Sequence, residues 1–156
     1  MADRILNGRL RRELREQRGL TYSAESAYRP SRAYPDASML TVAFYTSPER
    51  VDEAITSARR LVEKLASNGP SVAELEATRT HFQTIFERLQ SRPLYWSRTL
   101  ADLDYHGSTI EDIKTALDHY LTYPKEEIRA TLERYIIDDN HIRVVCRSRP
   151  AASERR

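Results

Sequence analysis

The segment Leu14-Arg15-Glu16-Gln17-Arg18-Gly19-Leu20-Thr21-Tyr22-Ser23 decides how this chain folds and where its candidate chemistry lies. An arginine-rich, helix-favouring run precedes Gly19 and an alternating run follows it, which predicts a helix that ends at glycine and turns into a strand. Arg15 in the last helical turn and Tyr22 early in the strand are then expected to lean toward one small volume. Together they can donate hydrogen bonds to a carbonyl oxygen or to the oxyanion formed from it.

The flanking segments extend this pattern into a helix and two strands. Leucines recur at helical spacing before the glycine, which predicts an amphipathic helix over residues 3–18. Alternation predicts a first strand over residues 20–28, and proline-containing segments at 29–36 predict a long hairpin loop. The second strand, residues 39–46, is apolar on both faces, as expected of a strand inside a sheet.

The rest of the chain is mainly helical. A Ser-x-x-Glu capping box predicts a helix start at Ser71, and another such box occurs at Ser108. Asp138–Asn140 predicts a turn, and the apolar run Ile142–Cys146 predicts a final strand. The predicted helices span residues 48–68, 72–90, 94–105, 110–121 and 125–135.

This order of elements predicts an α+β fold, a two-layer sandwich whose mixed sheet carries helices on one face. Residues 1–149 are expected to form one domain, because this length is close to the commonest domain size. A disordered tail is expected over residues 150–156. Three strands make a thin sheet for a core of this size, so a strand before the first helix is expected to be missing.

Composition and charge restrict the class of protein. Hydrophobic residues make up 40% and charged residues 31%, and no apolar run reaches the length of a membrane span, so a soluble protein is expected. The start, Met1–Arg4, lacks the apolar segment of a secretory signal. The net charge is +2, with 22 arginines against three lysines. Nucleic-acid binding is the alternative that these arginines raise, and it is not favoured because Glu13 and Glu16 interrupt the basic run and aromatic residues do not gather there.

No metal or nucleophile site is predicted within the chain. The histidines lack the spacing of a zinc motif, and Cys146 has no second cysteine for a disulfide or a metal pair. Cys146 is expected to be a buried, inert thiol in the final strand. Trp96 is assigned to the interface between helices and sheet. The four histidines are His81, His106, His119 and His141.

The run Leu6-Asn7-Gly8-Arg9-Leu10, followed by Leu14–Ser23, resembles the start of the C-terminal homologous domain of the insulinase and pitrilysin family of zinc metallopeptidases. Tyr95-Trp96 before a leucine-rich helix is most similar to the bacterial zinc proteases of the PqqL type. The resemblance spans residues 4–147. Further segments follow that domain in order, namely Ser47–Val51, Asn68–Ser71, Glu74-Leu75, Lys125–Ile128 and Asp139-Asn140.

The resemblance implies a LuxS/processing-peptidase-like metallohydrolase fold and roles for two residues. In that family, homologous domains face one another around a chamber, and the C-terminal half contributes an Arg and a Tyr seven residues apart. Arg15 and Tyr22 match these two. Arg15 would then bind a substrate backbone carbonyl, and Tyr22 would donate to the scissile carbonyl and its oxyanion. By residue type alone, the alternative is that Arg15 complements the helix dipole and Tyr22 packs.

The resemblance also implies a cofactor and a partner that this chain does not contain. The family's zinc is bound by an N-terminal half through His-x-x-Glu-His and a distal Glu, and this chain has no such motif. It is therefore expected to need a zinc-bearing N-terminal half or partner subunit, to act on peptides, and to be inactive alone. The alternative is a noncatalytic scaffold or docking subunit of the same fold. The PqqL-type likeness favours the periplasm over the cytoplasm.

Overall fold

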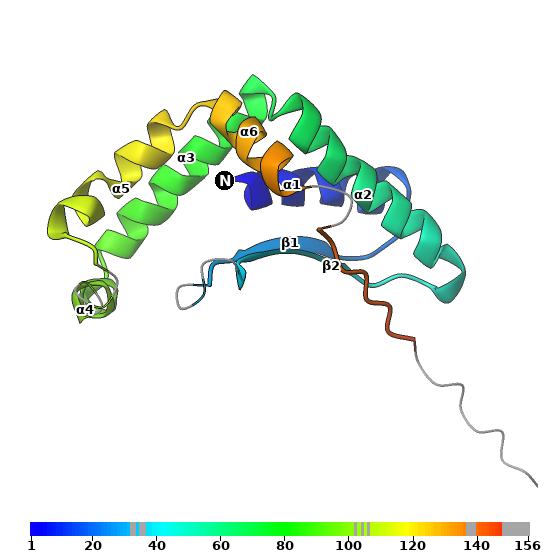
Figure 1. The fold of residues 1–156 in the computed structure, drawn as a ribbon, viewed down its shortest axis with the longest axis horizontal. Helices are drawn as coiled ribbons and strands as arrows, with labels where there is room; N and C mark the ends of the chain where they lie inside the picture. Colours follow the sequence, from blue (N-terminus) through cyan, green and yellow to red (C-terminus); the bar gives the residue numbers. More distant parts are fainter. Residues whose placement is uncertain are drawn as a thin grey trace, which may run out of the picture.

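A computed structural model describes residues 1–31, 34, 37–101, 103, 105, 107–136 and 140–147. A two-stranded sheet lies under a layer of helices, and a group of helices reaches away from the sheet (Figure 1). The predicted α+β class is confirmed. The elements are α1 (Ala2–Leu10), the π-helix η1 (Arg11–Gln17), β1 (Ala24–Arg29), β2 (Met39–Phe44), the 3₁₀ turn η3 (Pro48–Arg50), α2 (Val51–Asn68), α3 (Val72–Gln90), α4 (Pro93–Ala101), α5 (Ile110–Thr122) and α6 (Lys125–Tyr135).

The sheet is an antiparallel hairpin tied to the first helix. Ala24 of β1 lies opposite Phe44 of β2. The Asn7 amide of α1 donates to the Ser26 carbonyl and accepts from the Ser26 N–H, both at 2.7 Å. The backbone N–H and C=O of Ser26 are hydrogen-bonded to Asn7, which indicates that they point away from β2 in the antiparallel ladder. The amide thus fastens α1 to the outer edge of β1.

The predicted third strand does not form. Ile142–Cys146 makes no strand pairing within the described part of the chain, and the sheet is antiparallel rather than mixed. Cys146 is exposed, so the prediction of a buried thiol is also wrong. The segment contacts α2 through an ion pair of 2.5 Å between Arg143 and Asp52. Apolar alternation indicates that a segment suits a strand, but it does not supply a neighbour whose backbone groups are within reach.

The core lies between the sheet and the helices α1, η1, α2 and α6. The predicted amphipathic helix over residues 3–18 is divided at Leu10, where the α-helix passes into the wider turns of η1. Leu10 and Leu14 are both fully buried. We call residues 1–78 together with α6 the core unit. Its buried apolar cluster is Ile5, Leu6, Leu10, Leu14, Leu20, Ala54, Ala58, Leu65, Ala66, Leu75, Ile128 and Leu132.

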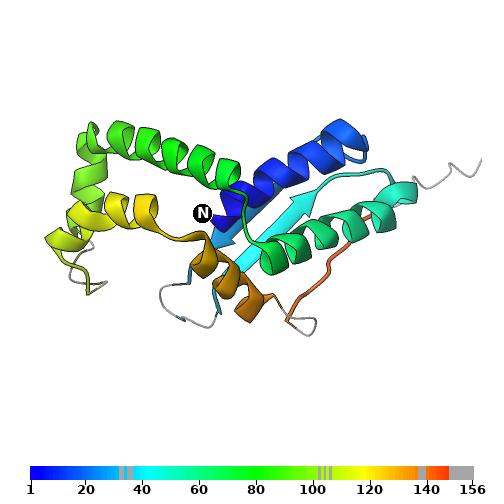
Figure 2. The same ribbon diagram turned by 90° about the horizontal axis from the view of Figure 1, so that it is seen from above.

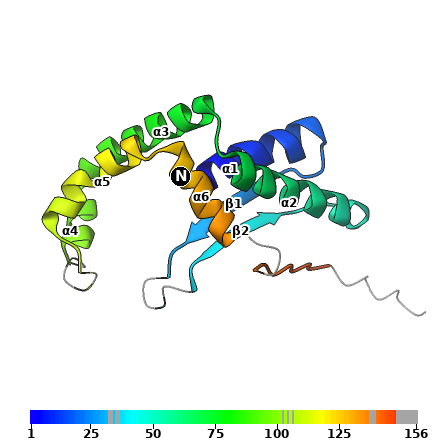
Figure 3. The same ribbon diagram turned by 45° about the horizontal axis from the view of Figure 1, so that its top comes forward.

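Residues 79–122, which comprise the rest of α3, α4 and α5, form what we call the arm. Figures 2 and 3 show it leaving the sheet, with α4 at its far end. None of the arm's described residues is buried. Its two long helices are joined by Phe82 of α3 and Tyr120 of α5, whose rings stack with centroids 4.9 Å apart. Trp96 donates its indole N–H to the Gln90 carbonyl at 2.8 Å and packs inside the arm. The prediction that it lies between the helices and the sheet is therefore wrong.

The helix ends follow local signals. The capping box predicted at Ser71 is confirmed, with Glu74 as its partner. The second box begins at Thr109, with Asp112 as partner, one residue later than the predicted Ser108. Backbone and side-chain hydrogen bonds from Thr109 lower the pKa of Asp112. Helix α6 has the predicted bounds.

Some expectations fall outside the described residues, namely the turn at Asp138–Asp139 and the tail at 150–156. Of the helices in the described part of the chain, none combines the length and the apolar character that a bilayer-spanning segment needs.

Candidate functional site

The site begins with the turn that follows η1. Gly19 has φ of +55°, a conformation that side-chain-bearing residues rarely adopt, which is why glycine ends this helix. Its N–H donates to the Arg15 carbonyl at 3.2 Å. The N–H groups of Leu20 and Thr21 both donate to the Leu14 carbonyl, at 2.6 and 3.3 Å. The predicted passage from helix through glycine is confirmed, although β1 starts only at Ala24.

The turn brings the two predicted site residues together. The guanidinium carbon of Arg15 lies 5.1 Å from the centroid of the Tyr22 ring, a cation–π contact. Tyr22 is 83% exposed, and Arg15 is also exposed. Among the described residues, neither the Arg15 guanidinium nor the Tyr22 hydroxyl makes a hydrogen bond to the protein. Both groups can therefore donate to a ligand without breaking an existing bond.

A hollow of about 420 Å³ lies beside Tyr22, which is one of its lining residues. Tyr45, which follows β2, is 84% exposed and lines it together with Tyr22. The residues that line it come from the turn after η1 and from the segment between β2 and α2, namely Gly19, Leu20, Thr21, Tyr22, Tyr45, Thr46, Ser47 and Arg50.

Sequence reasoning missed Tyr45 and Arg50. For Arg50 a signal existed, because a cation at the start of a helix opposes the helix dipole and usually implies another partner. That partner is the end of η1, since the Arg50 guanidinium donates to the Gly19 and Arg18 carbonyls at 2.9 and 3.2 Å. No sequence pattern marked Tyr45, which lies in the hollow only because β1 and β2 pair.

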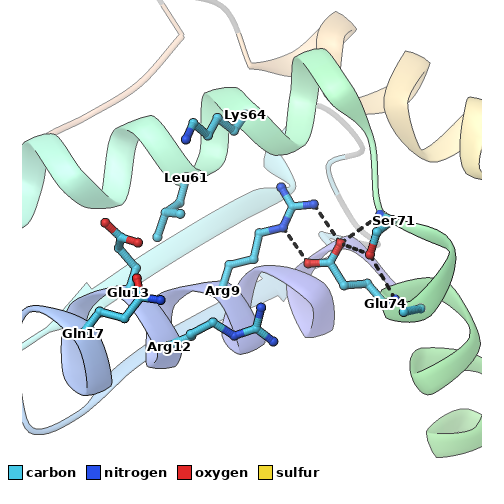
Figure 4. Close-up of a pocket in the computed structure, with 9 residues that line it drawn as sticks. Arg9, Arg12, Glu13, Gln17, Leu61, Lys64, Ser71 and Glu74 are labelled. Carbon is cyan, nitrogen blue, oxygen red and sulfur yellow. Dashed lines mark hydrogen bonds and ion pairs between the residues drawn. The ribbon is translucent and has the colours of Figure 1, made fainter.

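A second hollow, of about 450 Å³, lies between α1, η1, α2 and the start of α3 (Figure 4). At its end, Arg9 forms a two-pronged ion pair with Glu74, with N–O distances of 2.8 and 2.9 Å, and also donates to the Gly69 carbonyl at 3.1 Å. The Arg9 hydrogen bond, opposed by desolvation and helped by Ser71, lowers the pKa of Glu74 to about 2. Glu74 therefore stays ionised and joins α1 to the capped start of α3.

The described residues do not fit a zinc ion. No group of three His, Cys, Asp or Glu side chains among them is placed to hold a metal. His81 lies on α3, where burial and then the charges of Arg4 and Arg88 lower its pKa. His119 is exposed on α5, and Cys146 is exposed beyond α6. The described side chains therefore have no role in binding zinc.

Comparison with known proteins gives a family and a fold. The family model described as the peptidase M16 inactive domain matches residues 1–82. No curated protein matches the chain. The crystal structure of a peptidase M16 inactive domain from Pseudomonas fluorescens is similar, with a TM-score of 0.74 and 18% identity, and the match covers 89% of this chain and 34% of that one.

The periplasmic protease PqqL from Escherichia coli is also similar in structure. The TM-score is 0.64 and the identity 24%, over 86% of this chain and 15% of that one. At these identities the two likenesses show a shared fold. The chain spans about a third or less of the length of either structure.

Proposed function

The chain belongs to the family of peptidase M16 inactive domains, and on that premise we propose that it is the non-zinc-binding part of a zinc metalloendopeptidase. Membership confirms the family resemblance carried by the sequence. In the proposal, residues 1–149 act as one domain that forms a wall of a peptide chamber. The zinc ion and the attacking water belong to a zinc-bearing N-terminal half or partner subunit. The likeness to a periplasmic protease supports the periplasm as its compartment.

The observation that carries the proposal is the pairing of Arg15 with Tyr22 on an exposed turn. A guanidinium that lies over a ring face keeps its in-plane N–H donors at its rim, where a backbone carbonyl of an extended peptide can accept from them. The Tyr22 hydroxyl has no partner among the described residues and can donate to a second carbonyl. Arg15 therefore binds the peptide, and Tyr22 polarises the carbonyl that is attacked.

The two roles predict different kinetic effects. A donor that meets the oxygen only as negative charge develops stabilises the transition state, whereas a donor to a neighbouring carbonyl binds substrate and transition state alike. Loss of the Arg15 side chain should therefore mainly raise KM. Loss of the Tyr22 hydroxyl should mainly lower kcat.

The first test compares the chain alone with the chain plus a zinc-bearing domain of the same family. The chain alone should not hydrolyse an internally quenched peptide. Addition of the zinc-bearing domain should produce hydrolysis that a chelator abolishes. Chelator-resistant hydrolysis by the chain alone would contradict the proposal.

A noncatalytic scaffold is the second candidate, and one observation favours it. The Arg15 guanidinium already has a partner in the Tyr22 ring, so the pair can stabilise the turn without a substrate. In that case Arg15→Ala would destabilise the isolated chain and leave kcat/KM of the complex unchanged. The proposed function requires kcat/KM to fall, mainly through a higher KM.

A further inference from the structure

We propose that Arg50 is a positioning residue that fixes the geometry between Arg15 and Tyr22. The inference rests on the proposed function, because the position of the pair matters only if the pair binds a peptide. Among the described residues, Arg50 forms no hydrogen bond or ion pair with the Arg15 or Tyr22 side chain. It acts on the backbone that lies between them.

Arg50 binds the carbonyls of Arg18 and Gly19, the two residues that we call the joint of the turn. One terminal nitrogen donates to Gly19 at 2.9 Å and the other to Arg18 at 3.2 Å. These carbonyls lie at the negative end of η1, where a cation is favoured. The planar fork of a guanidinium can hold two acceptors at once in fixed directions, which a lysine ammonium does not reproduce.

The direction of a carbonyl reports the backbone angle ψ of its residue. Arg50 therefore restrains ψ at Arg18 and Gly19. Arg15 precedes this joint and Tyr22 follows it, so a change of ψ there moves one side chain relative to the other. Glycine has the widest choice of backbone conformations, which makes Gly19 the place where such a change is easiest.

A line of charges links Arg50, at the end of η3, to α2 and to η1. Glu53 of α2 lies 3.4 Å from Arg50 and 3.6 Å from Arg18, and Arg18 lies 2.8 Å from Glu13. All of these side chains are partly exposed, and such ion pairs contribute little to stability. Their arrangement instead holds the Arg50 guanidinium against the turn.

Two threonines hold the other side of the joint. Thr46 Oγ1 donates to the Leu20 carbonyl at 2.7 Å, and Thr21 Oγ1 lies 2.5 Å from the Tyr45 carbonyl. They anchor the link before β1 to the end of β2. Together with these threonines, Arg50 restrains residues 18–23, which connect η1 to β1 and belong to neither element.

The test is NMR spectroscopy of this chain with two matched variants. Arg50→Gln removes the two-carbonyl fork. Arg59→Gln removes the same charge from α2, the helix that follows Arg50, at a position about two and a half helical turns further along, where Arg59 lies 2.7 Å from Glu63. In the wild type, the Tyr22 ring should shift the Arg15 side-chain protons upfield. That shift should be lost in Arg50→Gln, strongly reduced in Arg50→Lys, and kept in Arg59→Gln.

An unchanged Arg15 shift in Arg50→Gln would overturn the proposal, whatever happens to the melting temperature. If Arg50→Gln does not fold, Thr46→Val loosens the same joint from the other side and should also reduce the shift. The Arg15 chemical shift tests the positioning role of Arg50 and does not test the proposed function. The upfield shift can be lost in Arg50→Gln while Tyr22→Phe leaves turnover in the complex unchanged. In that case the positioning role of Arg50 is confirmed and the proposed function is wrong.

Discussion

The core unit and the arm are held together in different ways. All the buried residues among those described belong to the core unit, where α1, η1, α2 and α6 close over the sheet. The arm has a stacked aromatic pair and surface contacts instead. The family match ends at residue 82, close to where the arm begins. Dense packing restricts which residues a position accepts, so a recognisable sequence pattern is expected where burial is deepest.

The candidate site belongs to the core unit, and this explains how an exposed pair can keep a defined geometry. Leu14, whose carbonyl accepts from both Leu20 and Thr21, is fully buried one residue before Arg15. The buried residue fixes the helix end, and the exposed neighbours project from it. The arm offers no such support at a fully buried position within its described residues.

The largest expected effect comes from a matched pair of leucine truncations. Leu14→Ala should lower the free energy of unfolding by about 2–5 kcal/mol, because it leaves a cavity in the core. Leu117→Ala, at a half-buried position in α5, should cost about 1 kcal/mol. Urea unfolding followed by circular dichroism measures both. Equal losses would remove the distinction between core unit and arm.

The ion pair between α1 and α3 gives the next largest effect. Glu74→Gln should lower the free energy of unfolding by about 1–3 kcal/mol at pH 7, since it breaks a charge-assisted pair and a helix cap. Glu76→Gln, which removes an exposed pair with Arg79 on the same helix, is the control and should cost less than about 1 kcal/mol.

The same pair predicts a pH dependence. The pKa of Glu74 is about 2 in the folded state against 4.5 as its ordinary value. A lowered folded pKa means that the stabilisation is complete above 4.5 and is lost as the pH falls toward 2. Glu74→Gln should lack this part of the acid profile. A wild-type and mutant profile of the same shape between these pH values would contradict the assignment.

The last expected effect on stability is local to the arm. Tyr120→Ala removes the ring that stacks on Phe82 and should cost about 0.5–1.5 kcal/mol beyond the lost buried area. Hydrogen exchange should speed up in α5 and stay unchanged in α1. Equal acceleration in both helices would show that the arm and the core unit open as one cooperative unit.

Sequence patterns predicted the features that local chemistry determines. The glycine at position 19, the capping box at Ser71 and the bounds of α6 each follow from signals within a few residues. The pairing of Arg15 with Tyr22 was predictable for the same reason, because both lie on one short turn. The roles of these two residues remain proposals.

The features that depend on distant contacts were not predictable. Periodicity could not show that η1 would form a π-helix or that Trp96 would pack within the arm. It also could not show that residues 142–146 pair with no strand in the part of the chain that the structure describes. For Arg50, the charge at a helix start indicated that a partner exists, but that partner lies 31 residues away in the sequence and only the fold identifies it. A choice between two similar capping boxes at Ser108 and Thr109 also needed the structure.

The central claim is that the Tyr22 hydroxyl acts on the scissile carbonyl. Its most direct test is kcat for hydrolysis of a quenched peptide by the complex of this chain with a zinc-bearing domain. Tyr22→Phe should lower kcat by about 10²–10³-fold, as for other oxyanion donors, with little change in KM. Tyr45→Phe is the control, because Tyr45 lines the same hollow and is as exposed. Equal kcat values for the wild type and both variants would contradict the claim and would favour the second candidate function, a noncatalytic scaffold.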